Sequence, residues 1–305
     1  MFEKIGLIPL PSLRPSWMHS HAYIPNAFLL NEKTVRIVLA FWDKHTIGRA
    51  GYLDVSAKNP LELLGYSEKP SLDVGEPGTF DDNGISPLCL TRQDTGKLWM
   101  YYAGWQLNDK IRYLIYTGLA ESVDDGVTFT RIKKTPVLER SDQELIIRSG
   151  CCVYREANHW KMLYAAGSNT VDIAGKPVPT YDLKSMISKD GVYWPDQGSL
   201  VFSPDKMKKE FGFGRPFVMK ENSIWKMWYG FRHLEKGYLM GYAESNDGER
   251  WNRKDEMMNE FNNDNWRHDN EMRSYPSILS IAGQSYMFYN GNAYGKEGVC
   301  VARAN

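Results

Sequence analysis

The chain repeats itself about every 60 residues, and this period limits the folds that it can adopt. A short apolar and aromatic run occurs as GKLWMYYAG at 96–104, HWKMLYAAG at 159–167 and IWKMWYGF at 224–231. A weaker copy, QSYMFYNG, lies at 284–291, and VRIVLAFWD takes the matching place at 35–43. Each run has the length and the residue types that are typical of a β-strand. The repeat therefore predicts a strand-rich unit that occurs five times in 305 residues.

Two further boxes complete the repeating unit. A proline, or a cysteine in its place, marks a strand before each aromatic run, and these anchors are Pro25, Pro87, Cys151, Pro216 and Pro276. After the run, boxes such as YAESNDGERW at 242–251 place an Asp-Gly turn between two strands. Four-stranded units that repeat around an axis are the blades of a propeller. We therefore predict an all-β protein that folds as a five-bladed β-propeller.

The two ends of the chain predict how the ring closes. The last unit stops at VCVARAN and lacks both an Asp-Gly box and a fourth strand. The segment FEKIGLIPL at 2–10 is similar to FTRIKKTPVL at 129–138, which follows the Asp-Gly turn of the second unit. We expect residues 2–8 to form the outer strand of the last blade, which would pair an otherwise exposed edge. We expect a single domain over 1–305, with blades at about 17–75, 80–138, 144–203, 211–256, and 270–305 plus 2–8.

Composition narrows the classes of partner and compartment. Lys plus Arg and Asp plus Glu are each 37, so no basic excess favours nucleic acid. No apolar run approaches the roughly 18 residues that span a membrane, and the start lacks the apolar core of a signal peptide. The four cysteines include no CxxC pair, which favours a reducing cytoplasm over a disulfide or zinc framework. We expect a cytoplasmic protein without a cofactor or metal, and its oligomeric state stays open.

Three groups of boxes resemble those of the five-bladed propeller glycoside hydrolases of families 43, 32, 68 and 130. They read FDDNGISP…GKLWMYYAGW…LAESVDDG, FGRPFVM…WKMWYGF…GYAESNDGERW and EMRSYPSI…YMFYNGNAYG. The resemblance covers nearly the whole chain and implies the propeller fold, although one fold hosts many functions. The segment 122–129 also resembles a sialidase Asp-box, and shorter copies lie at 188–194 and 245–251. We interpret all three as structural turns.

The strand before each aromatic run is the expected lining of the central channel. Since alternate residues of a strand share a face, residues at odd distances before the anchors should line the cavity together. This alignment predicts a charged cluster near the mouth of the cavity: Asp82, Glu271, Arg148, Arg273 and Arg215, with Glu144 just upstream. Other readings stay open. Asp82 would cap a turn, the arginines would form structural ion pairs, and Glu144 would face solvent.

Glycoside hydrolysis requires two carboxylic groups that flank the scissile bond. The resemblance implies carboxylates from the first three blades. Asp82 fits the second blade, and Glu144 fits the third only loosely. The first blade reads WMHSHAYIP and offers none. The candidate catalytic residues are therefore Asp82, Glu271 and Glu144, and the first blade departs from the pattern of the resembled hydrolases.

The arginines suggest the nature of the substrate. Guanidinium groups pair with carboxylates and phosphates, so Arg148, Arg215 and Arg273 favour an acidic sugar, a sugar phosphate or a nucleotide-linked sugar. Tyr275 and Trp105 are candidates for stacking on a sugar or base. His19 and His21 are further candidates for substrate contact, with a solvated or hydrogen-bonded role as the alternative. Two histidines alone are too few to indicate a metal site.

These observations favour a carbohydrate-active enzyme that cleaves or transfers a glycosyl group of an anionic or nucleotide-linked sugar. Its setting would be surface-glycan biosynthesis, and its partner a small-molecule sugar or nucleotide sugar. The first alternative is a non-catalytic glycan-binding propeller that lacks the first-blade carboxylate. The second is a protein-interaction propeller, which would require a broad exposed patch.

Overall fold

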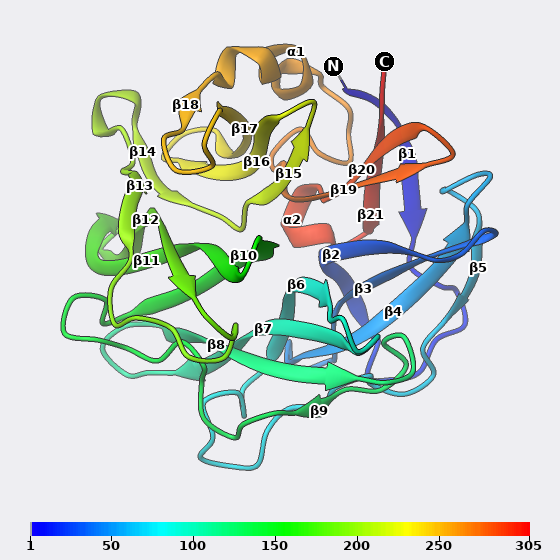
Figure 1. Ribbon diagram of the computed structural model, residues 1–305, viewed down its shortest axis with the longest axis horizontal. Coiled ribbons are helices and arrows are strands. Elements are labelled where there is room, and N and C mark those ends of the chain that lie inside the picture. The colour runs from blue at the N-terminus through cyan, green and yellow to red at the C-terminus, as the bar shows by residue number, and fades with distance from the viewer. Residues whose placement is uncertain (1) are drawn as a thin grey trace.

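Strands arranged around a common centre account for most of the computed structural model, which describes residues 2–305 (Figure 1). The first blade is an antiparallel sheet in the order β2 (Ser20–Asn31), β3 (Thr34–Trp42), β4 (Gly48–Ser56) and β5 (Leu63–Tyr66). The second blade contains β6 (Ile85–Arg92), β7 (Leu98–Leu107), β8 (Tyr113–Ser122) and β9 (Thr130–Arg131). In both blades the aromatic run forms the second strand, as the repeat predicts.

The third and fourth blades continue the ring. The third contains β10 (Ile147–Glu156), β11 (His159–Ile173), β12 (Lys176–Ser188) and β13 (Ser199–Phe202). In the fourth, the innermost strand is split into β14 (Glu210–Phe213) and β15 (Phe217–Glu221), which both pair with β16 (Ile224–His233). The outer strands of this blade are β17 (Gly237–Ser245) and β18 (Asn252–Arg253). The split falls at the anchor Pro216, which has no N–H for the ladder.

The fifth blade closes the ring with both ends of the chain. Its strands are β19 (Ser274–Ile281), β20 (Gln284–Asn290), β21 (Gly298–Ala304) and β1 (Phe2–Pro9). β1 and β21 are antiparallel neighbours, with Phe2 opposite Ala304 and Pro9 opposite Gly298 (Figure 1). Ile8 is fully buried in the core beside Val299 and Val301. The predicted fold class and the predicted closure by the N-terminal strand are both confirmed.

Aromatic side chains of the second strands form much of the packing between blades. Phe41, Tyr101, Tyr164, Tyr229 and Tyr289 come from five different blades, and each is fully buried. Burial of rings of this size dominates the energetics of a core. The repeated aromatic runs are thus mainly structural.

The Asp-Gly boxes are turns held by their own side chains. In 122–129, the Ser122 hydroxyl donates to Asp124 at 2.7 Å, and Asp124 accepts from the Thr128 N–H at 2.9 Å. The copies at 188–194 and 245–251 have the same pattern through Asp190 and Asp247. Hydrogen bonds from backbone N–H groups lower the pKa of Asp247 to about 2. The Asp-Gly boxes therefore recur because each forms the same hydrogen-bonded turn, which is a structural role.

In the described part of the chain, helical structure is confined to short connections. The helices are α1 (Asn259–Asn263) and α2 (Asn292–Gly295), with 3-10 turns at Lys206–Lys208 and Asp255–Met258. Within residues 2–305, no helix has the length and apolarity needed to cross a membrane. α2 matters for the site, because it carries Tyr294 to the central cavity.

Candidate functional site

Each innermost strand contains one residue more than its partner strand as it passes the centre of the ring. In the third blade, Ser149 lies opposite Ala165 and Cys152 opposite Leu163, so three steps along β10 match two along β11. The first and fifth blades have the same shift around Pro25 and Pro276. Such a β-bulge bends the strand and redirects its side chains. A bulge at the same place in several blades shapes the channel.

The bulges place strained backbone at the channel wall. Ile24, Gly150 and Tyr275 each stand one residue before an anchor, and their φ angles are 55°, 62° and 57°. Glycine adopts this left-handed region freely, but the branched Ile24 does not. Strain of this kind persists only where the surrounding structure enforces it, and it is often found at functional sites.

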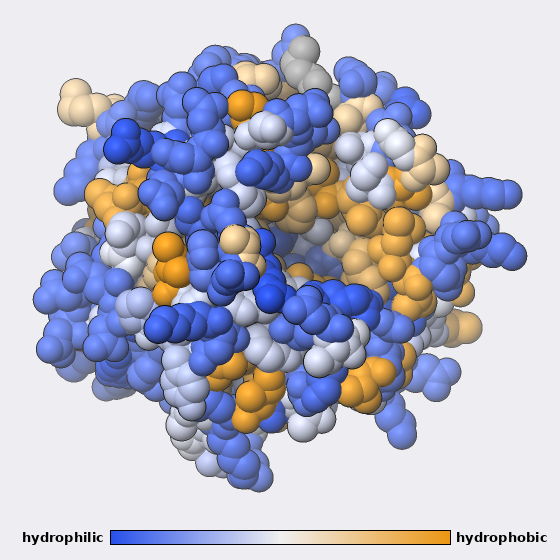
Figure 2. Space-filling model, viewed as in Figure 1, coloured by the Kyte–Doolittle hydropathy of each residue, from blue (hydrophilic) through white to orange (hydrophobic). Residues whose placement is uncertain are grey.

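The residue before each anchor lines a central cavity in every blade. These five residues are Ile24, Ser86, Gly150, Arg215 and Tyr275. The cavity has a volume of about 390 Å³, within the range of small-molecule sites. Figure 2 shows a hollow near the centre of this face, with apolar residues above it and to its right and mainly hydrophilic residues to its left and below it.

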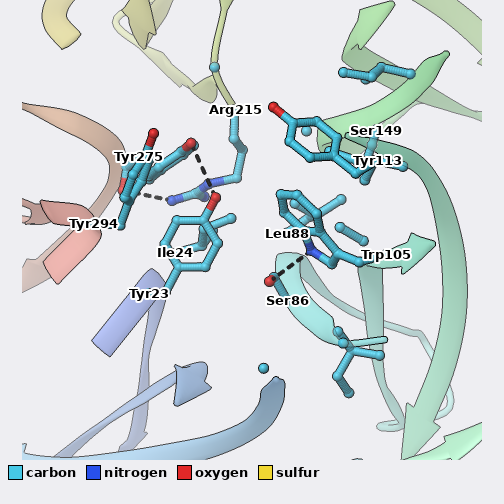
Figure 3. Close-up of a pocket in the computed structure, with 18 of the residues that line it drawn as sticks. Tyr23, Ile24, Ser86, Leu88, Trp105, Tyr113, Ser149, Arg215, Tyr275 and Tyr294 are labelled. Carbon is cyan, nitrogen blue, oxygen red and sulfur yellow. Dashed lines mark hydrogen bonds between the residues drawn. The ribbon is translucent and has the colours of Figure 1, made fainter. Parts of the chain in front are cut away.

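Two aromatic walls face each other across the cavity. Figure 3 shows Tyr23, Tyr275 and Tyr294 on one side and Trp105 and Tyr113 on the other. Tyr23 packs edge-on against Tyr275 and Tyr294 at 5.2 and 5.8 Å, and Trp105 packs edge-on against Tyr113 at 5.1 Å. The remaining rings of the lining are Trp42, His45, Tyr181, Phe213 and Tyr238. Rings in this arrangement can hold a flat or apolar face between them.

Three buried tyrosines of the cavity are neutral hydrogen-bonding groups at neutral pH. Burial raises the pKa of Tyr23, Tyr238 and Tyr275 well above its usual value. The Tyr23 hydroxyl donates to the Tyr275 hydroxyl at 3.3 Å. Opposite them, the buried hydroxyl of Ser149 has no partner within residues 2–305. The walls thus combine apolar faces with donors and acceptors.

Arg215 is a buried charge at the base of the cavity. It is 2% exposed, and its Nη2 donates to the carbonyl oxygen of Tyr275 at 2.8 Å (Figure 3). The same Nη2 donates to the carbonyl oxygen of Pro25 at 3.0 Å. Its Nη1 donates to Asn26 at 3.4 Å, and its Nε has no partner within residues 2–305. Burial lowers the pKa of this guanidinium. Its neighbours from the first and fifth blades are neutral acceptors.

Arg232 stands at the end of β16 and also lines the cavity. Its Nη1 donates to the Tyr181 hydroxyl and to the carbonyl oxygen of Pro179. The guanidinium lies 4.1 Å from the ring centroid of Phe211 and 5.7 Å from that of Tyr238. Sequence reasoning missed Arg232 because it searched only the innermost strands. The available signal was its position directly after the aromatic run IWKMWYGF.

No family model matches the chain. The uncharacterized protein Rv1502 of Mycobacterium tuberculosis is 28% identical over 303 residues, which cover 99% of this chain and 98% of that protein. A glycosyl hydrolase structure from Bacteroides ovatus has a TM-score of 0.71 at 15% identity and covers 100% of this chain and 93% of its own. A thermostable family-43 glycoside hydrolase has a TM-score of 0.65 at 14% identity, with coverage of 93% and 89%.

The chain has the five-bladed propeller fold of glycoside hydrolases. Identities this low establish the fold, and the chemistry of the cavity has to be judged from its own residues. The decisive question for a propeller of this kind is where the carboxylates lie.

The carboxylates expected at the mouth lie outside the cavity lining. Asp82 accepts from the Gly78 N–H at 2.8 Å and from the Asn83 amide at 2.6 Å, so it caps a turn. Glu271 is exposed, and its backbone N–H is held by Asn292. Among the described residues that line the cavity, none is an aspartate or glutamate.

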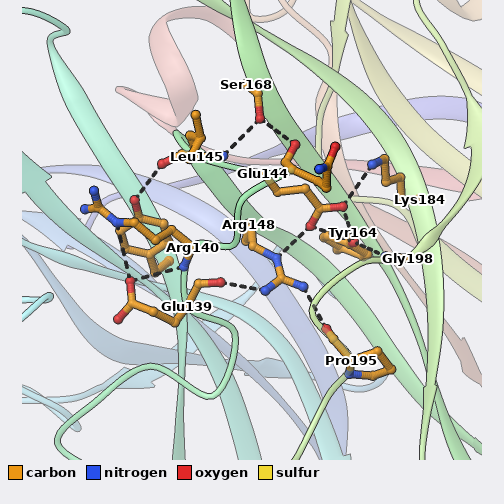
Figure 4. Close-up of polar contacts among 12 residues, drawn as sticks. Glu139, Arg140, Glu144, Leu145, Arg148, Tyr164, Ser168, Lys184, Pro195 and Gly198 are labelled. Atoms are coloured by element: carbon orange, nitrogen blue, oxygen red, sulfur yellow. Dashed lines mark hydrogen bonds and ion pairs between the residues drawn. The ribbon is translucent and has the colours of Figure 1, made fainter.

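Glu144 and Arg148 form a buried network inside the third blade (Figure 4). Glu144 is 1% exposed, and it accepts from Arg148 Nε at 2.6 Å and from Lys184 at 2.9 Å. Tyr164 donates to the same carboxylate at 2.8 Å. Neither Glu144 nor Arg148 lines the cavity, and their contacts are those of a structural ion pair.

Arg273 likewise points away from the cavity. It is 2% exposed, lies 3.6 Å from the Asp269 carboxylate, and donates to the carbonyl oxygen of Asp264 at 2.6 Å. The β-bulge gives the reason, because one extra residue exchanges the two faces of a strand. Before the bulge, Ile147 and Ser149 line the cavity, whereas Arg148 between them does not. The expected cluster of five charges therefore does not form, and only Arg215 of that set reaches the cavity.

The two histidines lie beside the cavity rather than in its lining. His19 is exposed. The His21 ring stacks on Trp42 with ring centroids 3.8 Å apart, and its Nδ1 contacts the Ser20 hydroxyl at 2.9 Å. Burial, with a smaller contribution from Lys296, lowers the pKa of His21 to about 4. His21 is therefore neutral at pH 7 and supports the ring of Trp42, which does line the cavity.

This lowered pKa predicts a pH dependence of stability. The unfolded chain binds a proton at His21 below about pH 6.5, whereas the folded chain binds it only near pH 4. The contribution of neutral His21 to the free energy of unfolding is therefore present above pH 6.5 and is lost as the pH falls toward 4. We expect His21→Gln to reduce the drop in free energy of unfolding between pH 7 and pH 5, measured by urea denaturation. His19→Gln, at an exposed site, should keep the wild-type drop, and an unchanged drop in His21→Gln would contradict the assignment.

Proposed function

We propose that the central cavity binds a carbohydrate and holds it without the two-carboxylate chemistry of glycoside hydrolysis. The observation that carries this proposal is a cavity with aromatic walls and no carboxylate among its described lining residues. A sugar has apolar faces, which stack on aromatic rings. It also has hydroxyl groups, which need hydrogen-bond partners. Trp105 and Tyr275 offer the first, and Arg232 Nη2, which makes no hydrogen bond within residues 2–305, offers the second.

The fold supports a carbohydrate ligand, and the lining argues against hydrolysis at this site. Retaining and inverting glycosidases both use a pair of carboxyl groups at the scissile bond. The Asp82 carboxylate caps a turn by accepting from the Gly78 N–H, and the Glu144 carboxylate lies in a buried ion pair with Arg148. Of the enzyme and the glycan-binding propeller, two of the three readings left by the sequence, the glycan-binding propeller therefore has the stronger support. Cleavage or transfer of an anionic or nucleotide-linked glycosyl group is the alternative that the assays must exclude.

The test combines binding with turnover. Isothermal titration with uronic acids, sugar phosphates, nucleotide sugars and neutral sugars is expected to give saturable binding of at least one class. Incubation with the same compounds and with nitrophenyl glycosides is expected to give no product. Turnover that is lost in Asp82→Asn or Glu271→Gln would overturn the proposal in favour of the enzyme. Absence of binding across all classes, with a folded protein, would overturn it as well.

Trp105→Ala is expected to weaken sugar binding by about tenfold or more, because a stacking surface worth about 1.4 kcal/mol or more is removed. The change should also abolish most of the ligand-dependent tryptophan fluorescence signal. Tyr193→Ala is the matched control, since that ring is 71% exposed and does not line the cavity. Equal affinities of the wild type and Trp105→Ala would place the ligand elsewhere.

A further inference from the structure

The cavity contains positive charge that the protein does not neutralise. Of the four buried arginines within residues 2–305, Arg36, Arg148 and Arg273 each lie within 4 Å of a carboxylate, at 2.7, 2.6 and 3.6 Å. Arg215 is the exception, because its partners are carbonyl oxygens and an amide. An unpaired buried charge is costly, so its retention needs a reason.

Nothing else in the lining compensates this charge. Arg232 and the exposed Arg112 also line the cavity. No aspartate or glutamate is among the described residues of the lining. Tyr23, Tyr238 and Tyr275 are neutral, since burial raises the pKa of their hydroxyls. A cleft of one sign with walls of low polarity concentrates its field on whatever enters it. The positive charge of the cavity therefore has no negatively charged partner among the described residues that line it.

Arg232 is the group placed to meet a ligand directly. Its Nη1 is used by Tyr181 and Pro179, and its Nε is buried without a partner, whereas Nη2 makes no hydrogen bond within residues 2–305. The rings of Phe211 and Tyr238 hold the guanidinium in position. A guanidinium that is fixed in this way binds carboxylate or phosphate oxygens without further loss of side-chain freedom.

Arg215 has a different part. Its donors are largely committed to the bulged strands at Pro25 and Tyr275, and its Nε is shielded. It ties the innermost strands of three blades together, and it places a full positive charge beneath the aromatic walls. It is thus a positioning residue that acts through its field rather than by contact.

We propose that the carbohydrate bound in this cavity carries a carboxylate or phosphate group, which docks on Arg232 above the buried charge of Arg215. This inference rests on the proposed function and narrows its ligand to one chemical class. The neutral part of the ligand lies between the aromatic walls, and the anion selects it against neutral sugars. Carboxylate and phosphate share the acceptor chemistry that a guanidinium recognises.

The test uses matched ligand pairs in isothermal titration with the full chain. The pairs are glucuronic acid against glucose, galacturonic acid against its methyl ester, and glucose 1-phosphate against methyl glucoside, with inorganic phosphate as the probe without a sugar. At least one anionic sugar is expected to bind tenfold or more tightly than its neutral counterpart. Its affinity should fall with rising salt, because exposed charge attraction is screened.

Arg232→Gln is expected to weaken binding of that anionic sugar by about 10- to 100-fold, the value of a charge-assisted hydrogen bond, and to change neutral binding by less than threefold. Arg250→Gln, an exposed arginine outside the lining, is the control. Arg215→Lys should keep the anionic preference while lowering the melting temperature, and Arg215→Gln should reduce the preference. If Arg215→Gln does not fold, the Arg232 comparison still decides.

The outcomes distinguish the anionic ligand proposed in this subsection from carbohydrate binding, the proposed function on which it rests. Equal binding of neutral and anionic sugars, or no selective loss in Arg232→Gln, overturns the anionic ligand and leaves carbohydrate binding intact. Inorganic phosphate that binds as tightly as every sugar phosphate also overturns it, because the sugar then adds nothing. Failure of all sugars and all anions to bind overturns both proposals.

Discussion

Glu144→Ala is expected to lower the free energy of unfolding by about 3–5 kcal/mol, the usual cost of breaking a buried ion pair from one side. The carboxylate accepts from Arg148, Lys184 and Tyr164, and it is almost completely enclosed. Removing it leaves two cations with no carboxylate partner and a cavity in the third blade. The melting temperature should fall by about 10 °C, at 2–4 °C per kcal/mol for a protein of this size.

The control separates a structural carboxylate from a catalytic one. Glu271→Gln changes an exposed carboxylate that makes no side-chain ion pair within residues 2–305, and it should leave the urea midpoint unchanged. Glu144→Gln keeps the shape but loses the charge, so it should fall between Glu144→Ala and the wild type. A Glu144→Gln protein with full stability but lost turnover would instead identify Glu144 as the acid that the sequence suggested.

Deleting residues 1–9 is expected to lower the melting temperature by about 10 °C or more. The deletion removes β1, which covers β21, and it exposes the core around the fully buried Ile8. It also removes Lys4, which pairs with the buried Asp269 at 2.9 Å. Loss of one buried aliphatic side chain and one buried pair amounts to several kcal/mol before the ladder hydrogen bonds are counted.

Point variants show that the effect comes from closure of the ring. Ile8→Ala should cost about 2–5 kcal/mol through the cavity it creates. Glu3 lies in the same strand, but its side chain is 59% exposed, and its one ion pair within residues 2–305 is with Arg303 at 3.3 Å, so Glu3→Ala should cost little. A truncated chain that melts like the full chain, by calorimetry, would show that β1 does not hold the ring together.

The positions that the sequence placed correctly depend on short-range pattern. The anchor prolines and Cys151 recur at a nearly fixed interval, and the residue before each of them lines the cavity in all five blades. A repeated local conformation needs a repeated local sequence, so such a position can be read without a structure. Arg215 and Tyr275 were predicted to line the cavity because each directly precedes an anchor, and both do line it.

The positions that the sequence misplaced depend on the bulge. Gly150 signals a left-handed backbone, but Ile24 and Tyr275 have the same φ with side chains that disfavour it. Simple alternation therefore placed Arg148 and Arg273 in the channel, whereas one extra residue turns them into the blades. Their acceptors, Glu144 and Asp269, are close in sequence, but only the folded chain shows that they form buried pairs.

The sequence by itself determined the number of blades, the order of their strands and the closure of the ring, because hydrophobic period and matching ends are properties of the linear chain. Only the tertiary structure decided which charges share the cavity. Arg232 comes from a second strand and Arg215 from a break in a first strand, and they line one cavity through the radial packing of separate blades. Side-chain direction at a bulge is set by contacts distant in sequence, and these contacts give the cavity its unneutralised positive charge.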